Sequence, residues 1–279
     1  MERMYNEEML KELKGFEVEL YARYEKYFDA NYFLHRNMLE MLKEDEAKIR
    51  ADDDIKRVIS YLFSACFKTY TSILLLCGKG FAPAAGILTR SLFENVINIK
   101  WILNNDQKER ARKFLNYSIV IKKKLYEKYN QYRIFDRLKS NVLDRMESVE
   151  SVKKAYTEVK DDYPNEIKWS GKNTRELAEE EGVNMGYDYD FYYWFFSLLT
   201  HSTVAAKETS TTVEGSTESV FYGPSFSPEI MVDILVLSYK YVLMAFVELD
   251  LILNLGKENN IKRFYKGFEE ISVRRNKDV

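Results

Sequence analysis

The chain of 279 residues contains few of the amino acids that interrupt helices. It has only four prolines and eleven glycines, which is well below average usage. Turn-rich β folds need more of both residues, so this shortage argues against them. Hydrophobic residues make up 46% and aromatic residues 15% of the chain, which is enough for a packed core. The composition therefore predicts long, uninterrupted helices.

Cysteine and histidine are equally scarce. The two cysteines, Cys66 and Cys77, are eleven residues apart in one apolar segment, which on one helix is too far for a disulfide. With two histidines and no Glu-x-x-His sequence, the chain lacks the ligands of a zinc site or a bundle di-metal site. His35 and the adjacent Arg36 predict a surface or packing pair. We expect two buried thiols in a reducing compartment, and no metal or other cofactor.

The chain carries no strong charge of one sign. Its formal net charge is −2, so no global field attracts nucleic acid. The N-terminus is charged and amphipathic, unlike a signal peptide. The longest apolar stretch, residues 231–255, is interrupted by Asp233, Lys240, Glu248 and Asp250, and charges are rare inside membranes. We therefore expect no membrane-spanning helix and a cytoplasmic protein.

Apolar residues recur at three- and four-residue spacing along most of the chain, as in amphipathic helices. We predict an all-α fold: one large bundle of long helices with an irregular central insertion. The Ser-, Thr- and Gly-rich residues 209–225 predict a loop or a short hairpin. The first predicted helical region, residues 6–49, is one long helix or two stacked ones. The others are residues 55–77, 83–103, 107–160, 174–182, 188–207 and 228–255. The predicted divisions are an N-terminal helical segment (1–50), the bundle core (51–256) and a peripheral basic C-terminal segment (257–279).

The most informative residues are Arg90 and Glu94, which lie one turn apart in the apolar segment PAAGILTRSLFENVINIKWIL. Burying a charge without a partner is costly, so these charges need an explanation. Their i,i+4 spacing puts them on one helix face, and Asn98 extends that face by a turn. They form either a charged cluster at a cleft, where they bind phosphate or polarise a substrate, or a partly buried ion pair or solvated stripe. Both interpretations stay open at this point.

A second group of polar residues surrounds His201 in the segment FYYWFFSLLTHSTVAAKE. Ser197, Trp194 and Asp190 precede it by four, seven and eleven residues, so these side chains can share one face. His201 is a candidate acid or base because histidine titrates near neutral pH, and the alternative is a hydrogen-bonded core histidine. A Ser-His-Asp hydrolase is disfavoured, because its serine would lie in mid-helix among phenylalanines. The aromatic run 187–196 is more typical of a core than of base stacking.

Three segments of the chain carry motifs in a recognisable order. They are LLLCGKGFAPAAGILTRSLFENVINIKWILNNDQKERARKFLNY, WSGKNTRELAEEEG and YYWFFSLLTHSTV. Together they resemble a bacterial all-helical family of unknown function (DUF5677-like), over about residues 55–255. The resemblance implies a helical bundle and supplies no activity, although such families often occur among anti-phage and toxin-like genes. The motif positions that it implies are Arg90, Glu94, Trp169, Ser197 and His201.

Three hypotheses account for the polar residues. The first is an anti-phage or toxin-like effector that cleaves RNA without metal, similar to higher eukaryote and prokaryote nucleotide-binding (HEPN) domains. Those domains carry Arg four to six residues before His, so here the site would be composite, from two helices. The second is a sensor that binds a small polar ligand or a partner segment, with long helices for homodimerisation. The third is a buried network that only sets helix register. The predicted catalytic residues are Arg90, Glu94 and His201, and the predicted binding residues are Asn98, Trp169 and Ser197.

Overall fold

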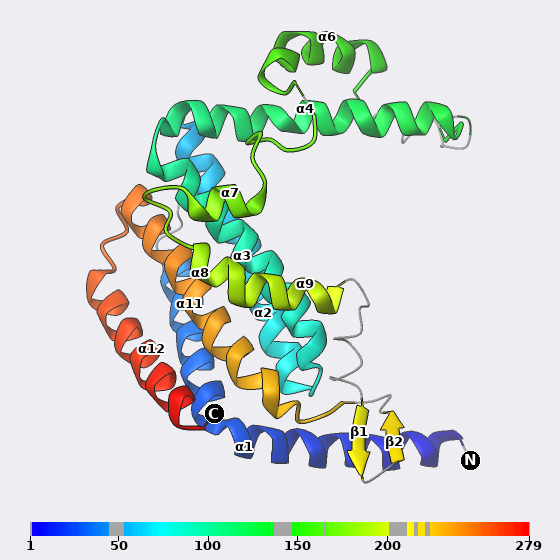
Figure 1. Ribbon diagram of the computed structural model, residues 1–279, viewed down its shortest axis with the longest axis vertical. Helices are drawn as coiled ribbons and strands as arrows, with labels where there is room; N and C mark the ends of the chain where they lie inside the picture. Colours follow the sequence, from blue (N-terminus) through cyan, green and yellow to red (C-terminus); the bar gives the residue numbers. More distant parts are fainter. Residues whose placement is uncertain are drawn as a thin grey trace.

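The computed structural model describes residues 2–44, 53–134, 136, 147–164, 166–200, 211–214, 217–220 and 224–278. Helices dominate this part of the chain, which confirms the predicted all-α class (Figure 1). The longer helices are α1 (Glu2–Glu44), α2 (Asp54–Gly78), α3 (Ala82–Asn104), α4 (Gln107–Gln131), α6 (Val149–Val159), α11 (Pro228–Leu253) and α12 (Glu258–Asp278). The shorter elements are η2 (Lys160–Asp162), α7 (Thr174–Glu179), α8 (Gly186–Asp188), the π-helix η3 (Tyr189–Tyr193), α9 (Trp194–Thr200), β1 (Thr211–Glu214) and β2 (Thr217–Val220).

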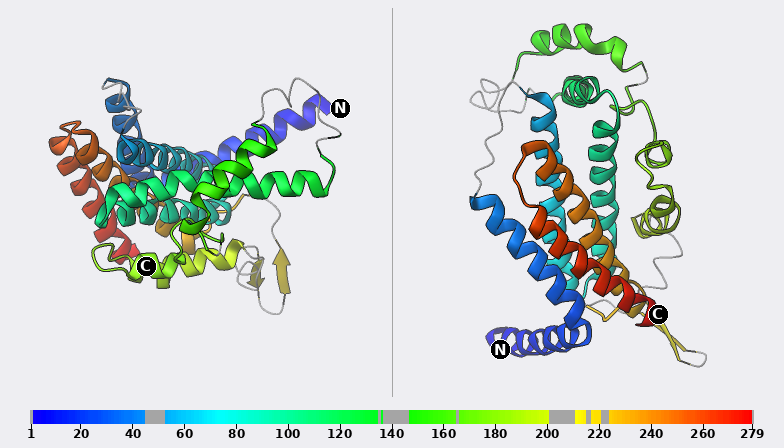
Figure 2. Two further views of the ribbon diagram at one scale, coloured as in Figure 1. Left: turned by 90° about the horizontal axis from the view of Figure 1, so that it is seen from above. Right: turned by 90° about the vertical axis from the view of Figure 1, so that its left-hand side faces the viewer.

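Helices α2, α3 and α11 lie side by side and form the centre of the bundle (Figure 2). Each is apolar around much of its circumference, so each can bury more than one face. Their buried side chains include Phe63, Phe93 and Phe246, and Phe246 packs against Phe63. Both thiols, Cys66 and Cys77, are buried and free in this core, as the sequence predicts. Burial raises the pKa of both thiols.

Helix α1 is bent at Tyr24, where the backbone leaves helical geometry (φ −116°, ψ 21°). Its first half projects from the bundle, whereas its second half packs along it (Figure 1). Asn31 joins this second half to the core: its amide donates to the Leu235 carbonyl at 3.2 Å, and its side-chain oxygen accepts from the Tyr70 hydroxyl at 2.8 Å. Helix α12 packs against α1 and α11 and buries Phe264.

The charged region that follows α3 folds back on itself. Helix α4 ends near Tyr132, Arg133 takes a left-handed conformation (φ 51°), and the Ile134 amide donates to the Tyr129 carbonyl at 2.8 Å. This is a common way to end a helix. Helix α6 then packs against α4 at one end of the molecule (Figure 1). In the described parts of the predicted helical region 107–160, there are therefore two long helices, α4 and α6, that pack against each other.

The segment from α7 to α9 runs along the outside of α3 (Figure 2). Helix α7 opens with a capping box, in which Asn173 and Glu176 exchange side-chain and backbone hydrogen bonds. Strands β1 and β2 pair antiparallel, with Thr211 opposite Val220. Of the two predictions for residues 209–225, a loop or a short hairpin, the hairpin therefore holds for residues 211–214 and 217–220. These connections place α7, η3 and α9 beside the polar face of α3.

Two helices of the described chain have the length and apolar composition of membrane spans, residues Asp54–Gly78 and Ile230–Leu253. In the second, 78% of the apolar window is buried inside the bundle, and in the first 44%. The core helices of soluble proteins have the same properties, so these two segments are weak evidence for a membrane protein.

Candidate functional site

Helix α3 carries the predicted polar face. Its apolar side, which includes Leu92 and Val96, is fully buried in the core. Arg90, Glu94 and Asn98 follow one another at single-turn steps and are only partly buried. This face points away from the core toward the α7–α9 segment, because the apolar side of the same helix packs against α2 and α11.

Arg90 and Glu94 form an ion pair that also binds two side chains of the α7–α9 segment. The guanidinium Nη2 lies 3.1 Å from Glu94 Oε1 and donates to the Tyr193 hydroxyl at 2.7 Å. The same hydroxyl donates to Glu94 Oε1 at 2.7 Å. Arg90 Nε donates to Ser197 Oγ at 2.9 Å. We call these four residues the Glu94 cluster, and it joins parts of the chain that are about 100 residues apart.

Helix α9 can reach α3 this closely because of Gly86. A Cβ atom at this position would lie 3.0 Å from the ring of Phe196, which is buried against α3. The small side chain therefore permits a short separation between the two helices. That separation brings Ser197 within hydrogen-bonding distance of Arg90.

Tyr193 is the centre of this cluster and is only 8% exposed. Burial is the largest cause that raises the pKa of its hydroxyl, and the hydrogen bond to Glu94 raises it further, against lowering contributions from Thr174 and Arg90. The hydroxyl therefore stays protonated at neutral pH. In that state it donates to Glu94 and accepts from Arg90, which holds both charged groups in place.

A pocket of about 270 Å³ opens beside Glu94. We call it the Glu94 pocket. Its lining residues are Glu94, Ile97, Asn98, Tyr117, Ile167, Lys168, Trp169, Ser170, Lys172, Thr174 and Leu177. Within the described residues, Glu94 Oε2 and the amide of Asn98 have no hydrogen-bond partner. The pocket thus combines unpaired polar atoms of α3 with the aromatic ring of Trp169.

Trp169 takes its position from other aromatic side chains. Its ring meets Trp101 edge-on at 5.2 Å between centroids and Phe114 edge-on at 5.0 Å. Both neighbours belong to long helices, α3 and α4, so the tryptophan is fixed by rigid elements although it comes from an irregular segment.

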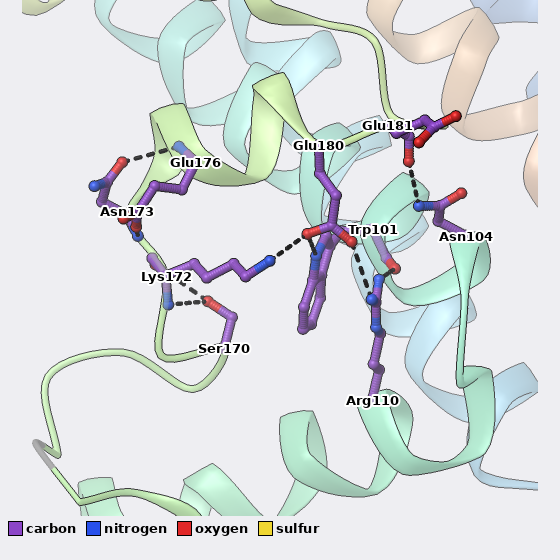
Figure 3. A network of polar contacts seen from close by, with 9 residues as sticks. All are labelled: Trp101, Asn104, Arg110, Ser170, Lys172, Asn173, Glu176, Glu180 and Glu181. Carbon is purple, nitrogen blue, oxygen red and sulfur yellow. Dashed lines mark hydrogen bonds and ion pairs between the residues drawn. The ribbon is translucent and has the colours of Figure 1, made fainter.

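A second ionic cluster is centred on Glu180, and Figure 3 shows its members. Glu180 accepts from Trp101 Nε1 at 2.6 Å, from Arg110 Nη2 at 3.0 Å and from Lys172 Nζ at 2.5 Å. The Arg110 guanidinium also lies 3.8 Å from the centre of the Trp101 ring. We call these four residues the Glu180 cluster. It joins the segment after α7 to both α3 and α4.

The chemistry of Glu180 follows from this environment. Burial alone would raise the pKa of its carboxyl group, but the hydrogen bonds from Lys172, Trp101 and Arg110 outweigh burial and lower the pKa to about 2. The carboxylate is thus charged across the physiological range, and both of its oxygens are already paired. Nothing in this arrangement leaves Glu180 available for a ligand.

Comparison with known proteins identifies the family. The sequence pattern described as "Family of unknown function (DUF5677)" matches residues 56–216, which is more than half of the chain. The chain belongs to this family. The match includes α3, the segment around Trp169 and α9, and residues 56–216 contain every predicted site residue. No curated protein and no solved structure matches the chain.

Five of the six predicted site residues of this DUF5677 protein lie in the Glu94 cluster or the Glu94 pocket, which share Glu94. Arg90, Glu94 and Ser197 belong to the Glu94 cluster, and Glu94, Asn98 and Trp169 line the Glu94 pocket. The sixth, His201, lies outside the described residues. The structure therefore brings together predicted residues from α3, from α9 and from the segment around Trp169, and their roles stay predictions.

The face of the predicted histidine helix differs from the expected one. Trp194 is 58% exposed, and Asp190 pairs with Arg175 at 3.3 Å, so neither joins Ser197 in the cluster. Tyr193 takes that place, because it is one turn before Ser197 and on the side that packs against α3. The π-helical turn at Tyr189–Tyr193 shifts the phase that a regular helix would keep, and a π-turn is not visible in a spacing pattern.

The remaining histidine has a packing role. His35 stacks on Phe67 at 4.9 Å between centroids and hydrogen bonds to Thr71 at 2.9 Å, and burial lowers its pKa. Arg36 pairs with Glu40 on the same helix. Of the predicted surface or packing pair, His35 therefore packs, whereas the Arg36 side chain is 80% exposed. Among the residues that the structure describes, no group of three or more His, Cys, Asp or Glu side chains could hold a metal ion.

Proposed function

We propose that this protein is a sensor or carrier that binds a small, planar, polar ligand in the Glu94 pocket. One observation carries the proposal: Glu94, Asn98 and Trp169 line one pocket, and among the described residues one carboxylate oxygen of Glu94 and the side-chain amide of Asn98 have no hydrogen-bond partner. Polar groups in a half-buried site gain most from a ligand that completes their hydrogen bonds. An aromatic ring in the same pocket favours a flat ligand.

The chemistry of the pocket narrows the ligand class. Glu94 accepts hydrogen bonds only, whereas Asn98 both donates and accepts. A nitrogen heterocycle of the nucleobase type has N–H donors and ring acceptors on one edge and a flat face for Trp169. The volume of about 270 Å³ suits such a base or a nucleoside, since pockets for drug-sized ligands begin at about 300 Å³.

Arg90 has a positioning role in this proposal. Its side chain is 24% exposed, and it is held by Ser197, Tyr193 and Glu94 together. A guanidinium that is already neutralised by a carboxylate is a weak phosphate ligand. Arg90 therefore fixes the orientation of Glu94, and the base rather than a phosphate is the part of the ligand that is recognised.

Titration with four nucleosides tests this function. Adenosine, guanosine, cytidine and uridine are each added to the ¹⁵N-labelled protein, and amide shifts are followed by NMR. At least one nucleoside should shift the resonances of α3 and of the connector around Trp169. The Glu94→Gln and Asn98→Ala variants should weaken that binding by roughly tenfold each.

Two matched variants serve as controls. Glu248→Gln changes a carboxylate that pairs with Lys100 and does not line the pocket, and Asn95→Ala changes another asparagine of α3. Both should bind the nucleoside like the wild type. If none of the four nucleosides binds, or if all four variants bind equally well, the proposal is wrong.

A ribonuclease effector is the second candidate, and the hydrogen bond from Arg90 Nε to Ser197 Oγ favours it. This bond ties the guanidinium to Ser197, which precedes His201 by four residues in the sequence. The test is expression of the wild type and of His201→Ala in bacteria. Growth arrest with RNA cleavage from the wild type alone would support the effector, and intact growth and RNA with a folded wild type would reject it.

Location and assembly belong to the same proposal. For both candidate functions we propose that the protein is a homodimer in the bacterial cytoplasm. For the ribonuclease effector we also propose a role in antiviral defence. Exposed apolar side chains on the outer part of α4, Ile121 and Leu125, support the dimer. Light scattering on the purified protein measures its mass directly.

A further inference from the structure

A second pocket, of about 740 Å³, lies where α12 crosses α1 and α11. We call it the α12 pocket. Its lining residues are Lys26, Asp29, Ala30, Phe33, Tyr239, Arg263, Lys266, Gly267, Glu270, Ile271 and Arg274. None of them belongs to the Glu94 cluster or to the Glu94 pocket. It is also larger than the Glu94 pocket, so a separate role needs its own explanation.

The charges at the rim of this pocket are unbalanced. Four cationic side chains line it against two carboxylates, and one of those carboxylates, Asp29, already accepts the Tyr21 hydroxyl. Lys26 and Lys266 make no ion pair with any described residue. The rim therefore carries an excess of positive charge, which attracts anions.

The inner wall of the pocket is apolar. Phe33 and Ile271 contribute side chains there, and the guanidinium of Arg263 covers one face of the Phe33 ring at 4.5 Å from its centre. Apolar walls below a charged rim suit a ligand that has both kinds of surface, because burial of its apolar part adds to the attraction of its charge.

Gly267 determines the shape of this wall. A Cβ atom there would lie 2.9 Å from the Tyr239 hydroxyl, and that hydroxyl is fixed by donating to the Phe264 carbonyl at 2.8 Å. Glycine thus lets α12 lie close against α11, and no side chain from position 267 enters the pocket. Any larger residue would have to push into the pocket or separate the helices.

We propose that the α12 pocket binds a small amphiphilic anion. The phosphate or carboxylate head lies at Lys26 and Lys266, where Arg274 adds to the positive charge, and the apolar body lies against Phe33 and Ile271. The proposal is independent of the ligand in the Glu94 pocket, because the two pockets share no residue.

Three matched probes separate the two halves of the proposed ligand. 1-Naphthyl phosphate has both the charge and the apolar ring, 1-naphthol lacks the charge, and inorganic phosphate lacks the ring. Binding to the full chain is measured by isothermal titration calorimetry at low ionic strength. 1-Naphthyl phosphate should bind at least roughly tenfold more tightly than either of the other two, since only it uses both parts of the pocket.

Two variants of α12 locate the binding. Lys266→Glu reverses a charge inside the pocket, and Lys262→Glu makes the same change on the same helix but outside it. Affinity for 1-naphthyl phosphate should fall by roughly tenfold or more in Lys266→Glu and by less than about threefold in Lys262→Glu. Equal losses, or equal binding of inorganic phosphate and 1-naphthyl phosphate, would show a diffuse surface attraction and overturn the proposal.

Filling the pocket gives a test that does not depend on charge. Gly267→Leu places a side chain at the inner wall and should abolish binding of 1-naphthyl phosphate while net charge is unchanged. Its circular dichroism and melting temperature are compared with those of the wild type. A folded Gly267→Leu that still binds with wild-type affinity would contradict the proposal, and if this variant does not fold, the two lysine variants decide.

Discussion

The Glu94 cluster and the Glu180 cluster both involve α3 and contain the same kinds of side chain. They differ in how many hydrogen-bond acceptors of the glutamate are already paired. Each joins an arginine, a glutamate and an aromatic ring: Arg110 with Glu180 and Trp101 in one, and Arg90 with Glu94 and Tyr193 in the other. The charged side chains are 13% and 17% exposed in the Glu180 cluster, against 24% and 35% in the Glu94 cluster.

The comparison distinguishes an ion cluster whose acceptor atoms are all paired from one that keeps an unpaired acceptor beside a pocket. Both oxygens of Glu180 are paired, and three donors from different segments converge on them. Glu94 uses one oxygen for both of its partners, the other has no hydrogen-bond partner among the described residues, and the side chain lines a pocket. Similar residues therefore differ in hydrogen-bonding capacity that is still free, and the number of unpaired acceptor atoms beside a pocket distinguishes the two clusters better than charge or residue type does.

The largest expected effect on stability is that of Glu180→Gln, which disrupts the Glu180 cluster. Glu180→Gln leaves the Arg110 guanidinium, which is 13% exposed, without its carboxylate. Removing one partner of a buried ion pair costs about 3 kcal/mol or more, so we expect the free energy of unfolding to fall by about that amount. Urea denaturation followed by circular dichroism measures the change.

The matched variant for this test is Glu94→Gln. Its partner Arg90 keeps the Tyr193 and Ser197 hydroxyls and is more exposed, so the loss should be about 1 kcal/mol. Equal losses of stability in Glu180→Gln and Glu94→Gln would mean that the Glu94 cluster stabilises the fold as much as the Glu180 cluster does. The two clusters would then not differ in their structural role.

Much of the fold was predictable because local signals dominate it. The low content of proline and glycine and the apolar spacing predicted α2, α3 and α11 nearly to the residue. The reversal after α4 was not predictable, because Arg133 adopts its left-handed conformation (φ 51°) without a glycine or proline to mark it. The bend at Tyr24 likewise lies in a continuous helical pattern.

The candidate site shows the same division between local and distant information. The spacing of Arg90, Glu94 and Asn98 placed them on one face, because i,i+4 geometry is local. Tyr193 was one of many aromatic residues in its segment, and only tertiary packing selects it. Glu180 lies in a run of three glutamates, and nothing in that run tells which carboxylate turns toward Trp101.

The next effect is the pH dependence of stability. The pKa of Glu180 is lowered to about 2 in the folded protein, from an ordinary value of 4.5. The stabilisation is complete above the ordinary value and is lost as the pH falls from about 4.5 to about 2. With a discount for the partly exposed Lys172, this loss amounts to about 2 kcal/mol. Urea denaturation at several pH values measures it.

Glu180→Gln is the control for this pH dependence. Its stability should be lower at neutral pH, and it should change less than that of the wild type across the same acidic range, since the responsible carboxyl group is gone. A wild type and a variant with parallel pH profiles would show that other carboxylates dominate acid unfolding.

Tyr193→Phe tests the centre of the Glu94 cluster. The variant keeps the buried ring but removes the hydroxyl that accepts from Arg90 and donates to Glu94. We expect a loss of about 1 kcal/mol in the free energy of unfolding, and weaker nucleoside binding because Glu94 is less well oriented. Tyr163→Phe is the matched control, since the hydroxyl of this buried tyrosine donates to the Lys113 carbonyl at 2.6 Å and Tyr163 does not line the Glu94 pocket. Unchanged nucleoside affinity in Tyr193→Phe would contradict the positioning role of the hydroxyl.

The smallest expected effect is that of Ser197→Ala. Ser197 Oγ donates to the Tyr193 carbonyl at 2.6 Å and accepts from Arg90 Nε at 2.9 Å, but Arg90 keeps its contacts to Tyr193 and Glu94. The loss in stability should be about 0.5–1 kcal/mol. Ser72→Ala removes the same kind of bond to the preceding turn, from Ser72 Oγ to the Lys68 carbonyl at 3.1 Å, without an arginine partner. The difference between the two losses isolates the Arg90 bond, and a Ser197→Ala loss no larger than that of Ser72→Ala would show that this bond contributes nothing to holding α9 against α3.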